Sequence, residues 1–173
     1  MRERVFGNTN IIAKRLGFGG IPIQRIDQAS AVELIENVKT LGINFIDTAR
    51  AYGVSETYIG EAIKGKEDHF YIATKSMARD YLAMKSDIEK SLKELQRPYV
   101  DLYQIHNVQI GEFDKFMGEE GAYRALKEAQ QDGKIKHIGI TTHTLESLEK
   151  IVDMGLDYFA SIQFPFNIVE SQG

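Results

Sequence analysis

Side chains that could exchange protons follow apolar runs of the sequence, at positions where buried strands would end: Asp47, Tyr52, Lys75 and His106. In parallel α/β folds the carboxyl ends of the strands meet on one face of a sheet or barrel, where enzymes place their reactive groups. Each residue also has a structural explanation, because an Asp after a strand often forms a turn and a loop Lys or His is often simply solvated or hydrogen-bonded. The occurrence of all of them at strand ends favours the functional interpretation.

The chemistry that these residue types suggest is proton transfer. A phenol has a pKa of about 10 and is a weak acid at neutral pH, but a neighbouring ammonium stabilises the phenolate and lowers that pKa. We therefore expect the Lys75 ammonium to lower the pKa of Tyr52. Asp47 would hold Lys75 charged and in place, and His106 would hydrogen-bond a substrate oxygen.

Apolar runs typical of strands alternate with stretches of helical periodicity along the chain. Strands are expected at 15–20, 42–47, 69–75, 99–105, 137–143 and 158–164. Helices are expected at 30–41, 55–64, 84–95, 121–131 and 144–154. Two short runs at 4–6 and 11–13, around a turn at 7–10, predict a hairpin before the main fold. Residues 111–118 are expected to be a loop, whose Phe113, Phe116 and Met117 either anchor it on the core or line a pocket.

Capping signals indicate where two of the helices begin. Ser30 with Glu33 three residues later forms a capping-box pattern, and Ser55 is expected to cap the next helix. The apolar positions of the first helix predict its buried face: Ala31, Leu34, Ile35, Val38 and Leu41.

Strand and helix alternation with short connections indicates an α/β fold with a parallel sheet, either an open doubly wound sheet or a barrel. The G-x-G-x-x-G turn of a dinucleotide-binding sheet is absent, because residues 17–20 do not lead into a helix start. We expect a single domain over residues 1–173, of the (β/α)8 TIM-barrel type, with an amino-terminal hairpin. Only about six of the eight barrel strands are expected, so the domain is carboxy-terminally truncated. Its open edges favour self-association, or a partner that supplies the missing wall.

Composition limits the functional classes. A net charge of −4 with interleaved acids and bases shows no footprint for nucleic acid or an anionic membrane. The absence of Cys excludes a disulfide framework, a thiolate metal site and a thiol nucleophile, and no metal site is expected. No apolar run approaches the length of a membrane span, so we expect a soluble, cytoplasmic protein.

The motifs around the candidate residues resemble the signature segments of the aldo-keto reductases. The matching segments are residues 44–49, 52–56, 73–75 and 104–107, and the similarity continues in order to 163–167. The resemblance implies a TIM barrel that reduces an aldehyde or ketone, a small-molecule carbonyl substrate, with NADPH or less often NADH. It implies Tyr52 as the proton donor, Asp47 and Lys75 as its tuning pair, and His106 as the group that orients the carbonyl.

The resemblance also implies a set of cofactor contacts: Gly20, Asp47, Thr141, Thr142 and Gln163. Thr141 and Thr142 lie where the family usually has Ser and Asn on the nicotinamide amide. Thr142 lacks the amide donor and acceptor that Asn would supply. The family segments that grip the 2′-phosphate and select substrates lie beyond Gly173, so the sequence predicts neither the substrate nor the choice between NADP and NAD.

Two further functions remain open. The chain could be a non-catalytic relative or remnant that binds a nucleotide or a partner chain, because the family's closing strands and cofactor-gripping loops are missing from it. A Schiff-base enzyme built on Lys75 would explain the lysine, but it would leave Tyr52, Asp47 and His106 without a combined purpose.

Overall fold

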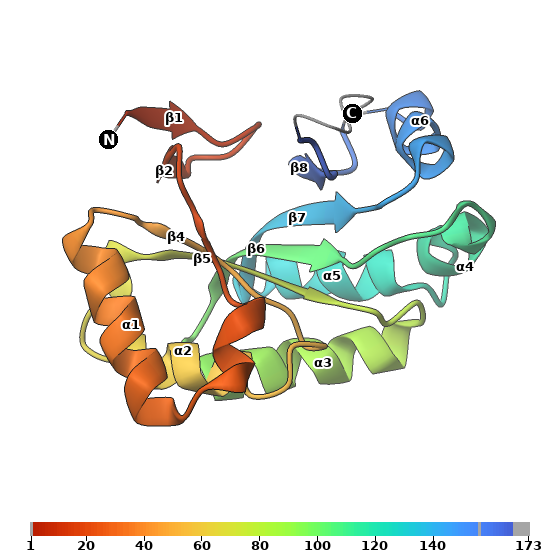
Figure 1. Cartoon of the computed structure of the whole chain (residues 1–173). Coiled ribbons are helices and arrows are strands. Elements are labelled where there is room, and N and C mark those ends of the chain that lie inside the picture. Colours follow the sequence, from red (N-terminus) through yellow and green to blue (C-terminus); the bar gives the residue numbers. More distant parts are fainter. Residues whose placement is uncertain (1, 156, 168–173) are drawn as a thin grey trace.

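The computed structural model describes residues 2–155 and 157–167, and it contains two sheets (Figure 1). The first is an antiparallel hairpin of β1 (Glu3–Val5) and β2 (Ile12–Lys14). The second is parallel, with its strands in sequential order: β3 (Phe18–Gly19), β4 (Phe45–Asp47), β5 (Tyr71–Ser76), β6 (Val100–Ile105), β7 (Ile135–Thr141) and β8 (Ser161–Gln163). The predicted hairpin and the prediction of six parallel barrel strands are confirmed.

The α-helices follow the parallel strands as crossover connections: α1 (Gln28–Thr40), α2 (Ser55–Ile63), α3 (Tyr81–Leu95), α4 (Phe113–Met117), α5 (Ala122–Gln131) and α6 (Leu145–Asp153). Short 3-10 turns complete the chain: η1 (Ile21–Arg25), η2 (Glu67–His69) and η3 (Ile110–Glu112). Figure 1 shows α1, α2, α3 and α5 along the outer face of the sheet, which curls through β6 and β7 up to β8. The fold is a curled half-barrel, as expected for an incomplete (β/α)8 barrel.

The main core lies between the outer face of the sheet and these helices. Helix α3 buries Met84, Ile88 and Leu95, each at most 2% exposed, and Leu92 on the same stripe is partly buried. Burying an aliphatic side chain of this size contributes roughly 1.5–3 kcal/mol, so this interface stabilises the helix–sheet packing strongly.

A second, smaller cluster lies on the inner face of the half-barrel. Ile11 and Ala13 of the hairpin pack on Ala73 of β5 and Leu102 of β6. Side chains two residues apart on a strand point to the same face, so Lys75 and Gln104, paired with one another in the register, lie on this inner face nearer the carboxyl ends of their strands. The hairpin therefore occupies the amino end of the interior, and polar side chains occupy the carboxyl end.

The predicted helix caps are wrong. Asp27 caps α1, and its carboxylate accepts a hydrogen bond of 3.0 Å from the Ser30 backbone amide, so the helix begins before Ser30. Ser55 is the first residue of α2, and its hydroxyl donates to the carbonyl of Gly20 at 2.9 Å instead of capping the helix. For α1, the Asp27 carboxylate takes the capping role that the pattern assigned to Ser30. For α2, the Ser55 hydroxyl donates to a distant carbonyl instead of accepting from an amide of its own helix.

The predicted buried face of α1 is correct only in part. Ala31, Ile35 and Val38 are buried, whereas Leu34 is 38% and Leu41 68% exposed. The buried residues follow one stripe with i, i+4, i+7 spacing, whereas Leu34 lies outside this stripe and Leu41 follows the last residue of the helix.

Residues 111–118 are largely helical, not a loop. A capping box between Gln109 and Glu112 starts η3, and α4 follows directly. Phe113 and Phe116 are buried with their ring centroids 5.0 Å apart, so the aromatic residues anchor this segment on the core. None of the helices in the described part of the chain has the length and apolar character that a bilayer crossing requires.

Candidate active site

Asp47 and Lys75 form an ion pair at the carboxyl ends of adjacent strands. The Lys75 Nζ atom lies 2.6 Å from Asp47 Oδ2 and 3.0 Å from the carbonyl oxygen of Thr48. The Lys75 side chain is only 3% exposed, and burial lowers the pKa of its ammonium, while the Asp47 carboxylate acts in the opposite direction. Asp47 therefore supports the charged form of a lysine that burial disfavours.

Tyr52 lies beside this ion pair, in the loop between β4 and α2. The Lys75 ammonium is 5.2 Å from the centroid of the Tyr52 ring. Gly53, with φ of +55°, follows Tyr52 and allows the tight turn that leads into α2. The structure thus brings together the phenol, the ammonium and the carboxylate that the sequence suggested.

The electrostatic effect on Tyr52 differs from our expectation. Burial, followed by the Asp47 carboxylate, raises the pKa of Tyr52, whereas we expected Lys75 to lower it. The reason is that Lys75 is already paired with Asp47 and faces the Tyr52 ring, while burial disfavours the phenolate. Tyr52 therefore carries its proton at neutral pH.

His106 follows β6, and its ring lies edge-on to that of Tyr52, with centroids 6.0 Å apart at 85°. Burial lowers the pKa of His106 to about 4, with smaller contributions from Lys75, His143 and Arg79, so the imidazole is neutral near pH 7. Its Nδ1 atom is buried without a hydrogen-bond partner among the described residues. An unpaired buried acceptor is tolerated better than an unpaired donor, which favours the tautomer with the proton on Nε2.

Gln104 is a site residue that the sequence interpretation missed. It is 2% exposed on the inner face of β6, and its Nε2 atom lies 3.5 Å from Asp47 Oδ1 and 3.3 Å from Gln163 Oε1. The available signal was a polar residue on an otherwise apolar strand, two positions before His106. Gln104 links the ion pair to the end of β8.

Thr141 and Gln163 are direct neighbours in the register of β7 and β8. The Thr141 hydroxyl accepts a hydrogen bond of 2.7 Å from the Asn107 backbone amide, which leaves its own proton available to a ligand. The Thr142 hydroxyl donates to the Val108 carbonyl at 2.9 Å and keeps only acceptor capacity. Thr141 and Gln163 thus offer donors side by side, whereas Thr142 offers none through its side chain.

Gly20 has a packing requirement of its own. Its amide donates to the Asp47 carbonyl at 2.7 Å, and an added Cβ would lie 2.8 Å from Ser55 Oγ. This close approach of β3 to α2 requires glycine at position 20. Its role in cofactor binding stays a prediction.

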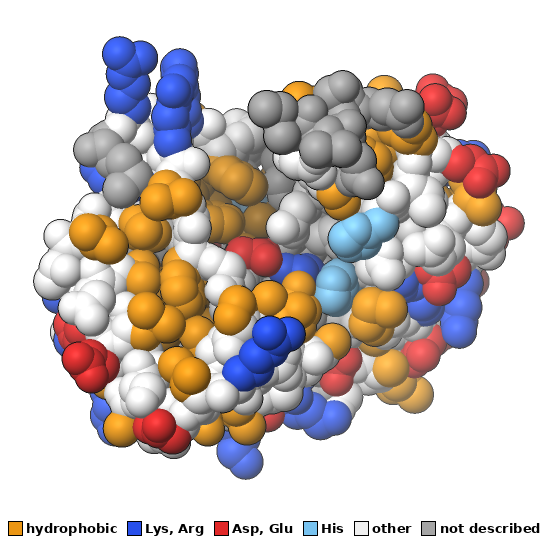
Figure 2. Space-filling view, in the orientation of Figure 1, with side chains coloured by type: hydrophobic (Ala, Val, Ile, Leu, Met, Phe, Trp, Pro, Cys, Tyr) orange, Lys and Arg blue, Asp and Glu red, His pale blue; other side chains and the backbone are white. Residues whose placement is uncertain are grey.

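A cavity of about 180 Å³ joins the candidate residues. It is lined by Tyr52, Lys75, His106, Thr141, Thr142, His143, Gln163, Phe164 and Pro165. In Figure 2 a hollow is visible in the middle of the displayed face, with two histidine side chains next to one another at its edge. A larger cavity of about 370 Å³ lies at the amino end of β7 and β8, where Asn8 meets Ala160, and it contains none of the predicted site residues.

The donor set of the smaller cavity fits part of a nicotinamide cofactor. Thr141 and Gln163 bring a hydroxyl and an amide to this cavity, and Lys75 and His106 add further polar groups to its lining. Its volume is below the roughly 300 Å³ of typical ligand pockets, so it suits a ring and not a whole dinucleotide. Within the residues that the structure describes, no group of three His, Asp or Glu side chains is arranged to hold a metal ion.

A half-barrel with an acid–base cluster at the carboxyl ends of its strands defines an α/β enzyme-type domain. The sequence profile of the Aldo/keto reductase family matches residues 15–173, and the chain belongs to this family. This confirms the resemblance inferred from the motifs. The family is one of oxidoreductases that act on small carbonyl compounds with nicotinamide cofactors.

Individual relatives agree with this assignment. L-galactose dehydrogenase of Arabidopsis thaliana is 31% identical over 87% of this chain and 51% of its own length. Aldo-keto reductase YhdN of Bacillus subtilis is 32% identical over 99% of this chain and 56% of its own length. The solved structure of aldo-keto reductase AKR11C1 from Bacillus halodurans, in its holo form, has a TM-score of 0.84 and 28% identity, covering 96% of this chain and 58% of that one. The chain spans about half the length of these curated relatives.

Proposed function

We propose that this chain carries the proton-transfer machinery of a carbonyl reductase that uses NADPH, with NADH as the alternative, and that residues 1–173 form one barrel-type domain. The observation that supports this most directly is the protonated Tyr52 phenol beside a buried Lys75–Asp47 pair and a neutral His106, around one cavity. A protonated phenol can give a proton, and a neutral imidazole can donate a hydrogen bond.

The geometry suggests how the residues act on a carbonyl substrate. When bound, a reduced nicotinamide supplies a hydride to the carbonyl carbon. The Nε2–H of His106 donates a hydrogen bond to the carbonyl oxygen and polarises the bond. As the oxygen gains electrons it takes the proton of the Tyr52 hydroxyl, and the phenolate remains beside the Lys75–Asp47 pair until solvent reprotonates it.

The predicted cofactor contacts belong to this proposal. Thr141 and Gln163 would hold the carboxamide, Asp47 would keep Lys75 in place, and Gly20 and Thr142 stay predicted cofactor contacts. The use of NADP, with NAD as the alternative, and the cytoplasmic location expected from the sequence stay predictions. We also propose that the chain self-associates, since β3 and β8 are each paired on one side only within the parallel sheet.

A second candidate is a non-catalytic relative that binds a nucleotide or a partner chain. It is favoured by the small cavity, whose volume of about 180 Å³ is below that of typical ligand pockets. Oxidation of NADPH by the purified chain, followed by absorbance with a panel of aldehydes, separates the two candidates. Turnover supports the reductase, whereas cofactor binding without turnover of any aldehyde supports the non-catalytic relative.

A further inference from the structure

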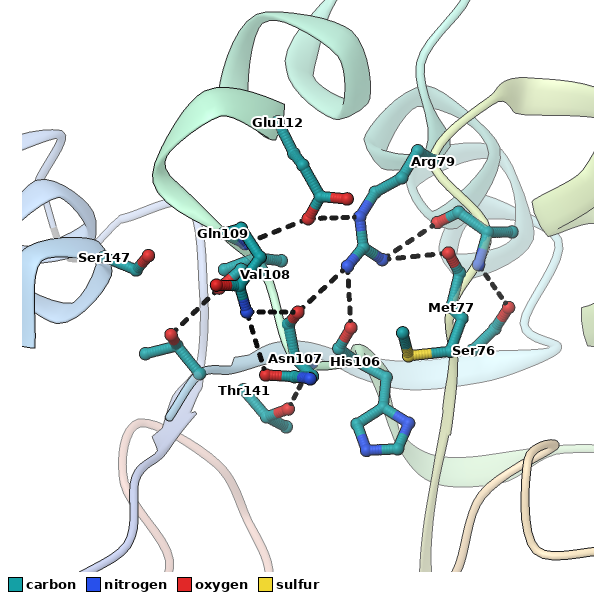
Figure 3. Close-up of polar contacts among 12 residues, drawn as sticks. Ser76, Met77, Arg79, His106, Asn107, Val108, Gln109, Glu112, Thr141 and Ser147 are labelled. Atoms are coloured by element: carbon teal, nitrogen blue, oxygen red, sulfur yellow. Dashed lines mark hydrogen bonds and ion pairs between the residues drawn. The ribbon is translucent and has the colours of Figure 1, made fainter. Parts of the chain in front are cut away.

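Arg79 lies in the connection between β5 and α3, and the function proposed above gives it no role. It is 6% exposed, and every N–H group of its guanidinium has an acceptor within 3.5 Å. Its Nε atom lies 3.0 Å from Glu112 Oε2, and Nη1 lies 3.0 and 3.5 Å from the carbonyls of Met77 and Ala78. Its Nη2 atom lies 2.8 and 3.2 Å from the carbonyls of His106 and Asn107. Figure 3 shows this guanidinium between the two connections, bonded to both.

The contacts fix one peptide unit at both ends. The carbonyl of His106 accepts from Arg79, and the amide of Asn107, in the same peptide unit, donates to Thr141 Oγ1 at 2.7 Å. Asn107 has φ of +51°, in the left-handed region that Asn adopts more readily than most residues with a side chain. The contacts of Arg79 and Thr141 hold the peptide in this conformation.

The orientation of the His106 imidazole depends on how its backbone is held. Its Nδ1 atom is unpaired within the described part of the chain, so no side-chain hydrogen bond at that atom orients the ring. In Figure 3 the ring points away from the guanidinium, on the far side of the fixed peptide. The backbone of residues 106 and 107 and the edge-on contact with the Tyr52 ring are therefore what direct the imidazole.

Glu112 completes the arrangement from the next element. Its Oε2 atom accepts from Arg79 Nε and, at 2.9 Å, from the backbone amide of Gln109 in the capping box of η3. The Glu112 side chain is 34% exposed, so the ion pair itself contributes little stability. Its effect is to fix the plane of the guanidinium, whose fork can serve several carbonyls at once, as a lysine ammonium cannot.

We propose that Arg79 is a positioning residue that fixes the peptide between His106 and Asn107, and thereby aims the His106 imidazole into the cavity. The catalytic meaning of this placement rests on the proposed reductase function. The placement itself does not, because it concerns the orientation of one ring in the free protein. A Lys at position 79 retains the charge but loses the fork, so it separates geometry from electrostatics.

The test is nuclear magnetic resonance of the full chain labelled at histidine, with the His106 imidazole assigned by its loss in His106→Gln. In Arg79→Lys we expect a changed tautomer signal for His106 and a titration midpoint at least one pH unit closer to the ordinary value of about 6.5. Arg97→Lys is the matched control, because Arg97 is also buried and donates to a backbone carbonyl, that of Phe70, at the opposite end of the barrel. It should leave the His106 signals unchanged.

A second variant keeps the test decisive if Arg79→Lys does not fold. Thr141→Val removes the acceptor at the other end of the same peptide and should change the His106 signals in the same direction. Unchanged His106 signals in Arg79→Lys or, failing that, in Thr141→Val would overturn the proposal, as would an equal change in Arg97→Lys. If the wild-type chain also turns over an aldehyde, Arg79→Lys should lower kcat about tenfold or more with little change in KM. If the His106 signals change in Arg79→Lys but the wild-type chain turns over no aldehyde, the positioning role of Arg79 is supported and the proposed reductase function is contradicted.

Discussion

Lys75 and Asp47 are 28 residues apart in the sequence, yet Lys75 Nζ lies 2.6 Å from Asp47 Oδ2 because parallel pairing of β4 and β5 brings their carboxyl ends together. Lys75 lines the cavity, and the pair gives Tyr52 a charged but compensated neighbour. Breaking the pair would leave a buried ammonium without its carboxylate, which is more destabilising than the loss of the attraction alone.

Asp47→Asn should therefore lower the free energy of unfolding by about 2 kcal/mol. This is below the 3–5 kcal/mol typical of fully buried pairs, because the Asp47 side chain is 22% exposed. Urea unfolding followed by circular dichroism measures the change. Glu120→Gln is the control, since Glu120 pairs with Arg124 at the surface and should matter by less than about 0.5 kcal/mol. Equal effects of the two substitutions would contradict the buried-pair interpretation.

The stability of the chain should fall as the pH is lowered from about 7 toward 4, partly through His106. In the unfolded chain a histidine takes up its proton near pH 6.5, whereas the folded chain holds the pKa of His106 at about 4. Between these values the unfolded state binds more protons, so acid favours unfolding. His106→Gln removes this contribution. The difference in unfolding free energy between wild type and variant should change across this pH window, and a constant difference would contradict the neutral, buried imidazole.

The acid–base cluster was predictable from the sequence because it depends on strand ends and on the two-residue alternation of strands. The four residues of the cluster follow apolar runs: Asp47, Tyr52, Lys75 and His106. In any parallel sheet the carboxyl ends of the strands lie along the same edge, so these residues come together there. The hairpin and the six parallel strands followed from the same patterns. The raised pKa of Tyr52 was not predictable, because it depends on how deeply the phenol is buried and on which atoms Lys75 already serves.

Other features left no periodic signal. Arg79 binds carbonyls of two separate connections, and only the folded backbone brings those carbonyls together. Asp27, not Ser30, caps α1. The sequence contains both residues as possible capping acceptors, and only the backbone conformation decides which of them lies at the first turn. Gln104 lies in one of the family motifs, but its role as a link between Asp47 and Gln163 depends on the register of the strands.

Gln163→Leu should weaken the binding of NADPH by about three- to tenfold, since it removes one amide contact worth roughly 0.5–1.5 kcal/mol. Fluorescence titration of the reduced nicotinamide measures the dissociation constant. Gln130→Leu is the matched control, because Gln130 lines the larger cavity at the amino end of the barrel. A loss of affinity in the control but not in Gln163→Leu would move the cofactor site away from Thr141 and Gln163.

Sedimentation should reveal oligomers of the purified chain that grow with concentration. Leu16 and Ile21 flank the edge strand β3 and are 56% and 47% exposed, and Figure 2 shows hydrophobic side chains gathered on one half of the displayed face. Leu16→Lys places a charge beside this edge and should shift the population toward monomer. A single monomeric species at all concentrations of the wild-type chain would contradict self-association through the open edges.

The assignment of Tyr52 as proton donor is tested most directly by the turnover of Tyr52→Phe, with Tyr58→Phe as the control. The substitution removes the hydroxyl and keeps the ring, whereas Tyr58 lies in α2, away from the cavity. We expect the rate of aldehyde reduction by NADPH to fall by on the order of a hundredfold or more in Tyr52→Phe, with nicotinamide binding within about twofold of wild type. The Tyr58→Phe rate should be unchanged. Near wild-type turnover by Tyr52→Phe would contradict the role of Tyr52 and, with it, the proposed mechanism.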